Sequence, residues 1–315
     1  MEGSAITRAV GTLDPLSFVG DKPPLGLIAG PTASGKSGHA VALAREVAAA
    51  GGTAVIINAD SAQMYADLHI LSARPREHDM DGIEHRLYGV WDGAEAGSAA
   101  DWAALARAEI AAVHKAGGVP ILVGGTGLYL RTLLEGIAPI PAIDPVVREE
   151  VRALPQEEAR RALEREDAGS AARLAPSDRA RTQRALEVVR ATARPIGEWR
   201  EMKAGGIEQE VTLDARILMP PRDALYARCD ARFAGMVESG AIGEVEALLA
   251  RRLDAGLPVM RAIGVPEITR FLGGAIALEQ AIAQGQTATR QYAKRQYTWF
   301  TRQPPPEWKR VPVAF

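Results

Sequence analysis

The residues best suited to chemistry lie in a glycine-rich segment near the start of the chain. This segment follows an apolar run, precedes a helical pattern and fits Gly-x-x-x-x-Gly-Lys-Ser. Glycines let backbone N–H groups converge on anionic oxygens, lysine adds positive charge, and a serine hydroxyl can bind Mg²⁺. The pattern therefore predicts a polyphosphate-binding loop rather than an empty glycine turn. Contacts are expected from Gly30, Thr32, Ala33, Ser34, Gly35, Lys36 and Ser37.

A carboxylate is expected beside this loop. Residues 53–60 are typical of a fully buried parallel strand that ends in Asp60. In open α/β sheets, ligands bind beyond the carboxyl ends of the strands. Because like charges repel, a carboxylate beside a phosphate needs a reason: Asp60 can hold Mg²⁺ or accept a proton from a second substrate. It can also cap the next element, so three roles remain open.

Strands and helices alternate along the part of the chain that must position these residues. Strands are expected over 53–60, over 85–92, from 119 and over 215–220, and helices over 37–50 and 98–116. The strand from 119 breaks into glycines near Thr126, whose hydroxyl lies at its carboxyl end. This order predicts an α/β fold with a P-loop NTPase-like core, in which helices flank a parallel sheet.

The composition changes at a proline-rich stretch near residue 139. We expect an inserted all-helical domain over 139–203, a core made of 23–138 and 204–315, and an N-terminal extension over 1–22. The segment 173–200 is rich in arginine. This pattern suits an anionic partner, but a solvated helix face produces it as well. A second basic segment, 287–310, interleaves aromatic residues, which suits an RNA strand or an anionic ligand beside an apolar wall.

Overall composition limits the possible functions. The 315 residues include no apolar run long enough to cross a membrane and no signal-peptide pattern, so we expect a cytoplasmic protein, monomeric by default, with no membrane partner. The single cysteine, Cys229, excludes an internal disulfide and a multi-cysteine zinc site. The net charge of −2 does not suggest nucleic-acid binding, but the two basic segments weaken that argument.

Five segments, in order between about residues 24 and 303, together point to a family. Segments 30–37, 60–65, 122–129, 184–188 and 289–300 closely resemble the tRNA dimethylallyltransferases, also called tRNA isopentenyltransferases. The resemblance implies a P-loop core with an inserted helical domain that helps grip the anticodon stem-loop of tRNA. It implies transfer of a dimethylallyl group from dimethylallyl diphosphate to N6 of the adenosine 3′-adjacent to the anticodon, in tRNAs reading U-initial codons.

The resemblance also implies roles for individual residues. The loop holds the diphosphate as a leaving group, with Mg²⁺ on Ser37, and Asp60 takes the N6 proton. Thr126 donates a hydrogen bond to the bridging oxygen, and Arg290 and Lys294 contact the diphosphate. Contacts with tRNA are expected from Ser61, Gln63, Tyr65, Arg181, Gln183, Arg184, Arg295 and Gln296.

Three stretches depart from the family's usual pattern. Residues 71–75 read Leu-Ser-Ala-Arg-Pro where Gly-Thr-Ala-Lys-Pro is usual, and 83–87 replace Pro-His-His-Leu. Val265 and Pro266 stand where Tyr and Lys are usual and cannot replace them. These positions affect details of substrate contact rather than the reaction.

Other functions share single features with this sequence. An adenylate isopentenyltransferase shares the loop and Asp60 but needs neither the inserted basic helices nor the segment 289–300. A small-molecule kinase or nucleotide-hydrolysing switch needs a second acidic motif, which the sequence lacks. A non-catalytic RNA-binding protein does not need a carboxylate beside a phosphate loop.

Overall fold

The structure is a computed structural model that describes residues 14–313, and this part of the chain divides into two compact units. Unit 1 contains residues up to 131 and from 208 onward, and unit 2 contains residues 132–207. The boundaries expected at 139 and 203 both fall inside unit 2. Of the expected N-terminal extension, residues 1–13 lie outside the described residues.

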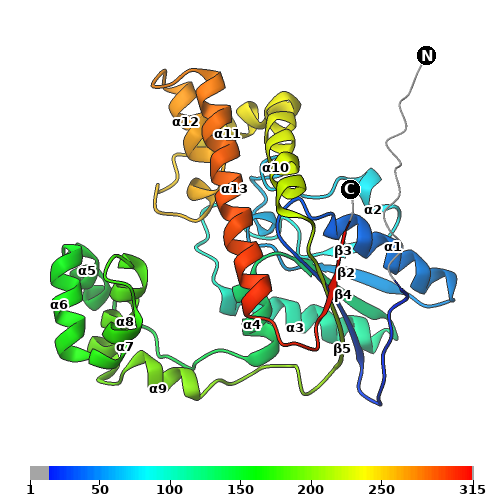
Figure 1. Cartoon of the computed structure of the whole chain (residues 1–315), viewed down its shortest axis with the longest axis horizontal. Coiled ribbons are helices and arrows are strands. Elements are labelled where there is room, and N and C mark those ends of the chain that lie inside the picture. The colour runs from blue at the N-terminus through cyan, green and yellow to red at the C-terminus, as the bar shows by residue number, and fades with distance from the viewer. Residues whose placement is uncertain (1–13, 314–315) are drawn as a thin grey trace. The chain divides into compact units, whose positions relative to one another are not determined.

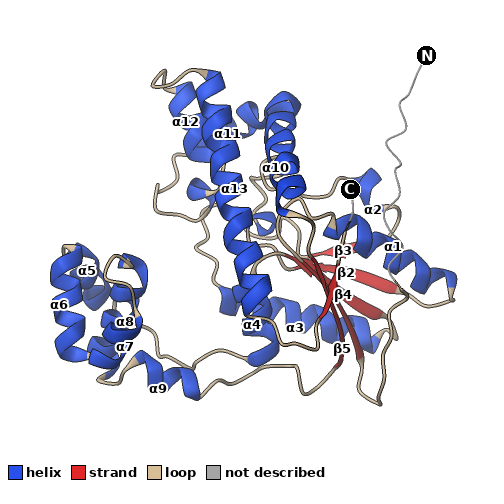
Figure 2. Ribbon diagram, viewed as in Figure 1, coloured by secondary structure: helices blue, strands red, loops and turns tan. Residues whose placement is uncertain are grey.

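Unit 1 is built on a six-stranded sheet in the order β3-β2-β4-β1-β5-β6, in which every pairing is parallel (Figures 1 and 2). The strands are β1 (Pro24–Ala29), β2 (Ala54–Asn58), β3 (Glu84–Arg86), β4 (Val119–Gly124), β5 (Thr212–Leu218) and β6 (Lys309–Val311). Helices lie on both sides of the sheet (Figure 2). The predicted α/β core with a parallel sheet is confirmed.

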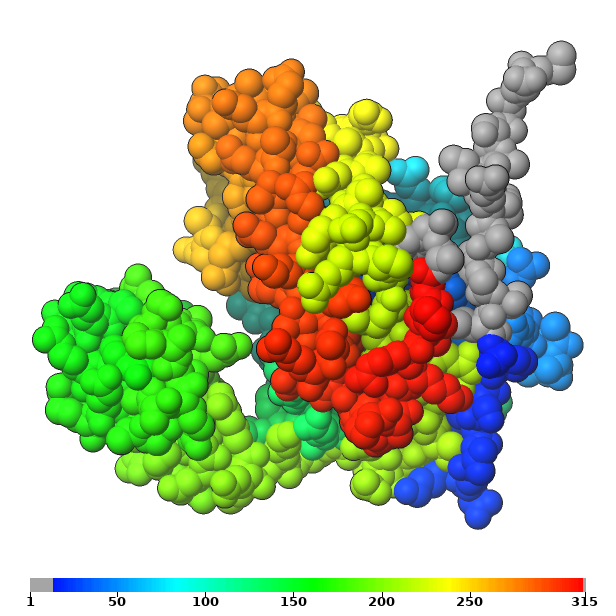
Figure 3. Space-filling view, viewed as in Figure 1, coloured from blue at the N-terminus to red at the C-terminus, as the bar shows by residue number. Residues whose placement is uncertain are grey.

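The first helices of unit 1 alternate with the strands along the chain, and the last four α-helices follow β5 in succession. They are α1 (Lys36–Ala49), α2 (Glu77–Met80), α3 (Ala99–Lys115), α4 (Gly127–Glu135, which runs into unit 2), α10 (Arg222–Met236), α11 (Ile242–Ala250), α12 (Val265–Leu272) and α13 (Leu278–Arg302). Short helical turns are η1 (Ala62–Met64), η2 (Val237–Ala241) and η3 (Val259–Arg261). The long helices α10 and α13 pack against one another (Figure 3).

The core of unit 1 explains why its strands are apolar on both faces. Ile28, Ile56 and Val123 are buried against α1, and the neighbouring residues Leu27 and Leu122 are fully buried as well. Each such side chain stabilises the fold by about 1.5–3 kcal/mol when it leaves water. The N-terminus of α3 is fixed by Ser98, whose hydroxyl accepts a hydrogen bond from the Asp101 N–H.

The third strand is shorter than the sequence suggested. The chain leaves the sheet at Leu87, whose φ of 62° is left-handed and incompatible with an extended strand. The Leu87 carbonyl is held there by the Asn58 side-chain amide at 3.0 Å. The chain pairs again only at Trp91, which forms an isolated bridge with Tyr65. The predicted strand over 85–92 was therefore wrong beyond residue 86.

Unit 2 is all helical and has its own apolar core. Its helices are α5 (Pro145–Ala153), α6 (Gln156–Glu166), α7 (Ala168–Arg173), α8 (Arg179–Thr192) and α9 (Ile196–Glu201). Val151, Leu163 and Leu186 are completely buried at the centre. The predicted inserted helical domain is confirmed. Along residues 14–313, no helix is both long and apolar enough to cross a membrane.

Candidate active site

The glycine-rich loop joins β1 to α1 and lines a cavity of about 360 Å³. Gly35 has a φ of 86°, which favours glycine, and a Cβ on Gly30 would lie 2.8 Å from the Leu218 carbonyl oxygen. Any other residue would therefore strain the loop at these two positions. Of the loop residues expected to bind an anion, Thr32, Ala33, Gly35, Lys36 and Ser37 line the cavity. Gly30 and Ser34 are not in the lining, and Ser34 is fully buried.

Lys36 provides the loop's own positive charge. Its Nζ donates a hydrogen bond to the Pro31 carbonyl at 3.3 Å. Burial lowers the pKa of Lys36 to about 8, and the nearby carboxylate of Asp60 opposes this shift. The lysine therefore loses its proton at a lower pH than an exposed lysine does, unless an anion binds beside it.

Two arginines from α10 add positive charge at the same cavity. Arg232 Nη1 donates to the Thr32 hydroxyl at 3.3 Å, and Arg228 Nε donates to the Ala33 carbonyl at 3.0 Å. Burial lowers the pKa of Arg232, whereas Asp60 favours its charged form. Neither arginine was predicted from the sequence: their i, i+4 spacing places them on one face of a helix but does not say which part of the protein that face meets.

The two basic residues that were expected at the diphosphate are not brought to this cavity. Arg290 forms an ion pair with Asp230, and Lys294 is exposed on α13. Neither belongs to the lining of the loop cavity. The packing of α10 against α13 therefore places the arginines of α10, rather than the basic residues of α13, at the loop. The periodicity of one helix cannot predict which of two helices supplies these residues.

Asp60 follows β2 at the carboxyl edge of the sheet, as expected. Its backbone N–H donates to Asn58 Oδ1 at 2.9 Å, and its Oδ1 accepts a hydrogen bond from the Ala62 N–H at 3.1 Å. Asp60 therefore bonds to the first N–H group of η1 and also lines the loop cavity. Capping and a place at the cavity are not alternatives here, because a carboxylate can do both.

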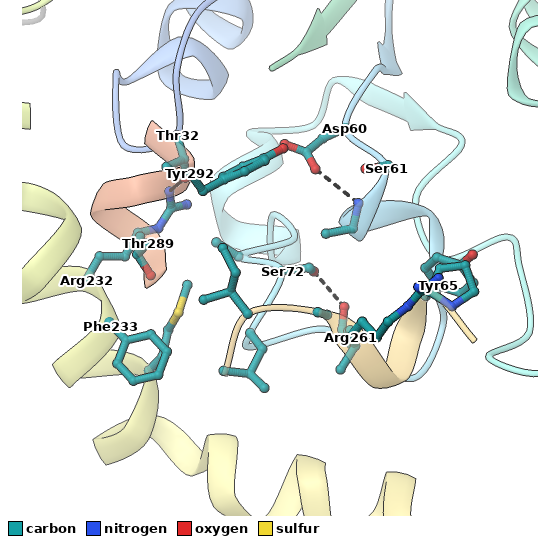
Figure 4. A pocket seen from close by; sticks show the side chains of 18 of the residues that line it. Thr32, Asp60, Ser61, Tyr65, Ser72, Arg232, Phe233, Arg261, Thr289 and Tyr292 are labelled. Carbon is teal, nitrogen blue, oxygen red and sulfur yellow. Dashed lines mark hydrogen bonds between the residues drawn. The ribbon is translucent and has the colours of Figure 1, made fainter. Parts of the chain in front are cut away.

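A second cavity of about 370 Å³ adjoins the first, since Thr32, Asp60 and Arg232 line both. Its lining includes the apolar side chains of Leu68, Leu71, Phe233, Met236 and Ile263, together with the arginines Arg232, Arg261 and Arg295. Ser61 and the ring residues Tyr65, Tyr129 and Tyr292 line it as well. Figure 4 shows Tyr292 extending toward Asp60, with Phe233 on the far side of the pocket. An anion in the first cavity can therefore direct an attached apolar group into the second.

Thr126 lies beside this junction rather than in the wall of either cavity. Its hydroxyl oxygen accepts from the Ser61 N–H at 3.1 Å, and the hydroxyl donates to Ser61 Oγ at 3.4 Å. The Tyr292 phenol is close enough to interact with Thr126, and burial raises the pKa of this tyrosine. Thr126 is thus held between the strand-end turn at Ser61 and helix α13.

The residues of unit 1 expected to contact tRNA occupy different environments. Ser61, Tyr65 and Arg295 line the second cavity, and the Arg295 guanidinium lies 5.8 Å from the Tyr292 ring centre. The Gln63 amide nitrogen donates to the carbonyls of residues 72 and 73. Gln296 is 5% exposed, and its amide bonds to the Thr32 N–H and the Gly125 carbonyl. The structure therefore gives Gln296 a positioning role inside the protein.

The other three expected tRNA contacts lie on α8 in unit 2. Arg181 is paired with Asp178, and Arg184 with Glu187. The Gln183 amide donates to the Arg152 carbonyl at 3.4 Å. Both arginines are exposed, so their guanidinium groups remain accessible to an anionic partner.

Glu244 on α11 also helps to shape the site, although the sequence did not predict it. Its carboxylate accepts hydrogen bonds from three consecutive backbone N–H groups, those of His69, Ile70 and Leu71, at 2.6, 2.7 and 2.9 Å. This turn leads into residues 71–73 of the second cavity's wall. No sequence signal links residues so far apart, because the contact depends on where α11 packs.

Together, the parallel sheet, the glycine-rich loop between β1 and α1 and the strand-end carboxylate define an α/β protein with a helical insertion. A family model described as IPP transferase matches residues 63–303. A tRNA dimethylallyltransferase of Erythrobacter litoralis is 63% identical over 292 residues, which cover 93% of this chain and 92% of that protein. One of Sphingopyxis alaskensis is 58% identical over 91% of this chain and 92% of the relative. The chain belongs to the tRNA dimethylallyltransferase family and is a prenyltransferase.

Solved structures agree with this assignment. The full-length tRNA isopentenylpyrophosphate transferase of Bacillus halodurans has a TM-score of 0.66 at 32% identity, covering 92% of this chain and 90% of that one. A eukaryotic dimethylallyltransferase, captured acting on tRNA, has a TM-score of 0.75 at 27% identity. That match covers 88% of this chain and 70% of the eukaryotic chain.

Proposed function

We propose that this protein transfers a dimethylallyl group from dimethylallyl diphosphate to N6 of the adenosine 3′-adjacent to the anticodon, in tRNAs that read U-initial codons. The observation that carries this proposal is the junction of the two cavities. A cationic, loop-lined cavity meets an apolar and aromatic one at Thr32, Asp60 and Arg232. This arrangement suits a substrate with a diphosphate at one end and a hydrocarbon at the other.

The loop cavity is the proposed leaving-group site. The C1–O bond of dimethylallyl diphosphate breaks as the C1–N6 bond forms, so negative charge accumulates on the departing diphosphate. Backbone N–H groups of the loop, together with Lys36 and Arg232, stabilise that charge. The Thr126 hydroxyl is the proposed donor to the bridging oxygen. Its bond to Ser61 Oγ, at 3.4 Å, is long enough to be exchanged readily.

Asp60 is the proposed base. The adenine amino group is a poor nucleophile because its lone pair is delocalised into the ring, but its proton becomes acidic once N6 is alkylated. A carboxylate at the junction of the two cavities can accept that proton. The target adenosine must leave the anticodon stack to reach the junction.

The loop cavity also suits Mg²⁺. Mg²⁺ prefers oxygen ligands and often takes one or two from the protein, the rest coming from phosphates and water. Ser37 and Asp60 supply such oxygens to the cavity, although the described residues contain no group of three or more potential ligands from His, Cys, Asp or Glu. The proposed role of Ser37 is to hold the ion, which when bound neutralises charge on the diphosphate.

The proposed macromolecular partner is the anticodon stem-loop of tRNA. The names of the relatives support this, as do exposed arginines on α8 such as Arg181 and Arg184. Arginine suits phosphate contacts because its planar group can donate two parallel hydrogen bonds. We propose that the protein acts as a monomer in the cytoplasm.

Product analysis tests the proposed function. The purified protein is incubated with Mg²⁺, dimethylallyl diphosphate and unmodified tRNA that reads a U-initial codon, and the digested RNA is analysed by mass spectrometry. The expected product is N6-dimethylallyladenosine, which should be missing when guanosine replaces the target adenosine. No modified nucleoside, together with turnover of ATP, would show that the loop serves a kinase or hydrolase instead.

A further inference from the structure

Two apolar side chains meet at one side of the second cavity. Both Leu71 and Phe233 line it, and both lie over the backbone of Gly264. A Cβ on Gly264 would lie 2.5 Å from Leu71 Cδ2 and 3.2 Å from Phe233 Cε2. The two side chains approach this closely because residue 264 has no side chain. Together they form one apolar stretch of the cavity wall.

This part of the wall is held firmly. The Leu71 N–H donates to Glu244 Oε2 at 2.9 Å, within the three-bond contact that fixes the turn. The Phe233 ring lies against α13 where Gly285 leaves room, since a Cβ there would overlap the ring. A fixed wall discriminates by size because it cannot yield to a longer ligand without breaking these contacts.

The proposed function, on which this inference rests, sets the direction of the hydrocarbon chain. With the diphosphate in the loop cavity, C1 lies near the junction at Asp60. The hydrocarbon then lies along the apolar side chains of Leu71 and Phe233, because contact between apolar surfaces removes both from water. The polar and aromatic wall near Ser61 and Tyr65 is left for the adenine.

We propose that Leu71, backed by Phe233, sets the chain length of the allylic diphosphate that this enzyme accepts. The five-carbon dimethylallyl group ends before this wall, whereas the ten-carbon geranyl group collides with it. Because Leu71 lines the cavity, glycine at this position would leave space at this point of the wall.

Competition between two donors tests the proposal. Wild type, Leu71→Gly and Leu71→Ala each receive tRNA with equal concentrations of dimethylallyl and geranyl diphosphate, and mass spectrometry gives the ratio of the two modified nucleosides. A hydrophobic pocket rejects one extra methylene by about 10–200-fold. Wild type should therefore favour dimethylallyl transfer at least about ten-fold, and both variants should raise the geranyl fraction by at least about ten-fold.

Ile70→Ala is the matched control. Ile70 belongs to the same turn and bonds to the same Glu244 carboxylate, but it lines a neighbouring cavity rather than this one. Its substitution should leave the donor ratio unchanged. Thermal unfolding of each variant checks the fold, and Leu71→Ala decides the outcome if the glycine variant is unfolded.

The outcomes separate this inference from the function on which it rests. An unchanged ratio in a folded, active Leu71 variant would overturn the inference, as would equal use of both donors by wild type. An equal shift in Ile70→Ala would also overturn it, because the effect would then belong to the turn as a whole. Failure of wild type to transfer any dimethylallyl group would instead contradict the proposed function.

Discussion

The side-chain Oε1 of Gln296 accepts a hydrogen bond from the backbone N–H of Thr32 at 2.7 Å. Its Nε2 donates to the Gly125 carbonyl at 2.8 Å, so one buried amide on α13 joins the loop after β1 to the turn after β4. This side chain, which the resemblance led us to expect at the tRNA, therefore holds the phosphate-binding loop in place.

Replacement of Gln296 by alanine should weaken donor binding more than tRNA binding. Loss of the amide leaves a part-buried N–H and a buried carbonyl without these partners, and the buried carbonyl alone costs about 1–3 kcal/mol. We expect a lower melting temperature and a higher KM for dimethylallyl diphosphate, with tRNA affinity little changed. The matched control is Gln291→Ala, an exposed glutamine on the same helix. Weaker tRNA binding with an unaltered donor KM would restore the original interpretation of Gln296.

The lowered pKa of Lys36 predicts a pH dependence. The charged lysine attracts the diphosphate, and it loses its proton as pH rises through about 8 in the free protein. The kcat/KM for dimethylallyl diphosphate should therefore fall above about pH 8. The kcat, measured at saturating donor, should fall less, because the bound diphosphate favours the charged lysine. In Lys36→Arg, kcat/KM should no longer decline above about pH 8, because arginine stays charged in this range. The same decline in Lys36→Arg would assign it to another group.

Arg232 should matter more than Arg290 for use of the donor. Arg232 lines both cavities, whereas Arg290 is paired with Asp230 outside the loop cavity. Hydrogen bonds to charged groups contribute about 1.5–3 kcal/mol, so Arg232→Ala should lower kcat/KM for the donor by about 10–100-fold. Arg290→Ala should have a clearly smaller effect. The reverse order in steady-state kinetics would support the diphosphate contact expected from the sequence.

The parts of the site that sequence could predict are those formed within short segments. The loop at 30–37 and Asp60 are recognisable because their chemistry depends on adjacent residues and on the end of one strand. Arg232 and Glu244 were missed because their roles depend on how α10 and α11 pack against distant segments. The third strand was overestimated because the left-handed backbone at Leu87 leaves no mark in an otherwise strand-like sequence.

The most direct test of Asp60 as the base compares wild type with Asp60→Ala in dimethylallyl transfer and in tRNA binding. The proposed mechanism requires the Asp60 carboxylate to accept the N6 proton, whereas the proposed tRNA contacts also include Arg181 and Arg184 on α8. Transfer of the dimethylallyl group should fall by at least about a hundred-fold, the lower range for a general base, while the Kd for tRNA changes little. Transfer at near wild-type rate, or loss of tRNA binding by the folded variant, would contradict the assignment of Asp60 as the base.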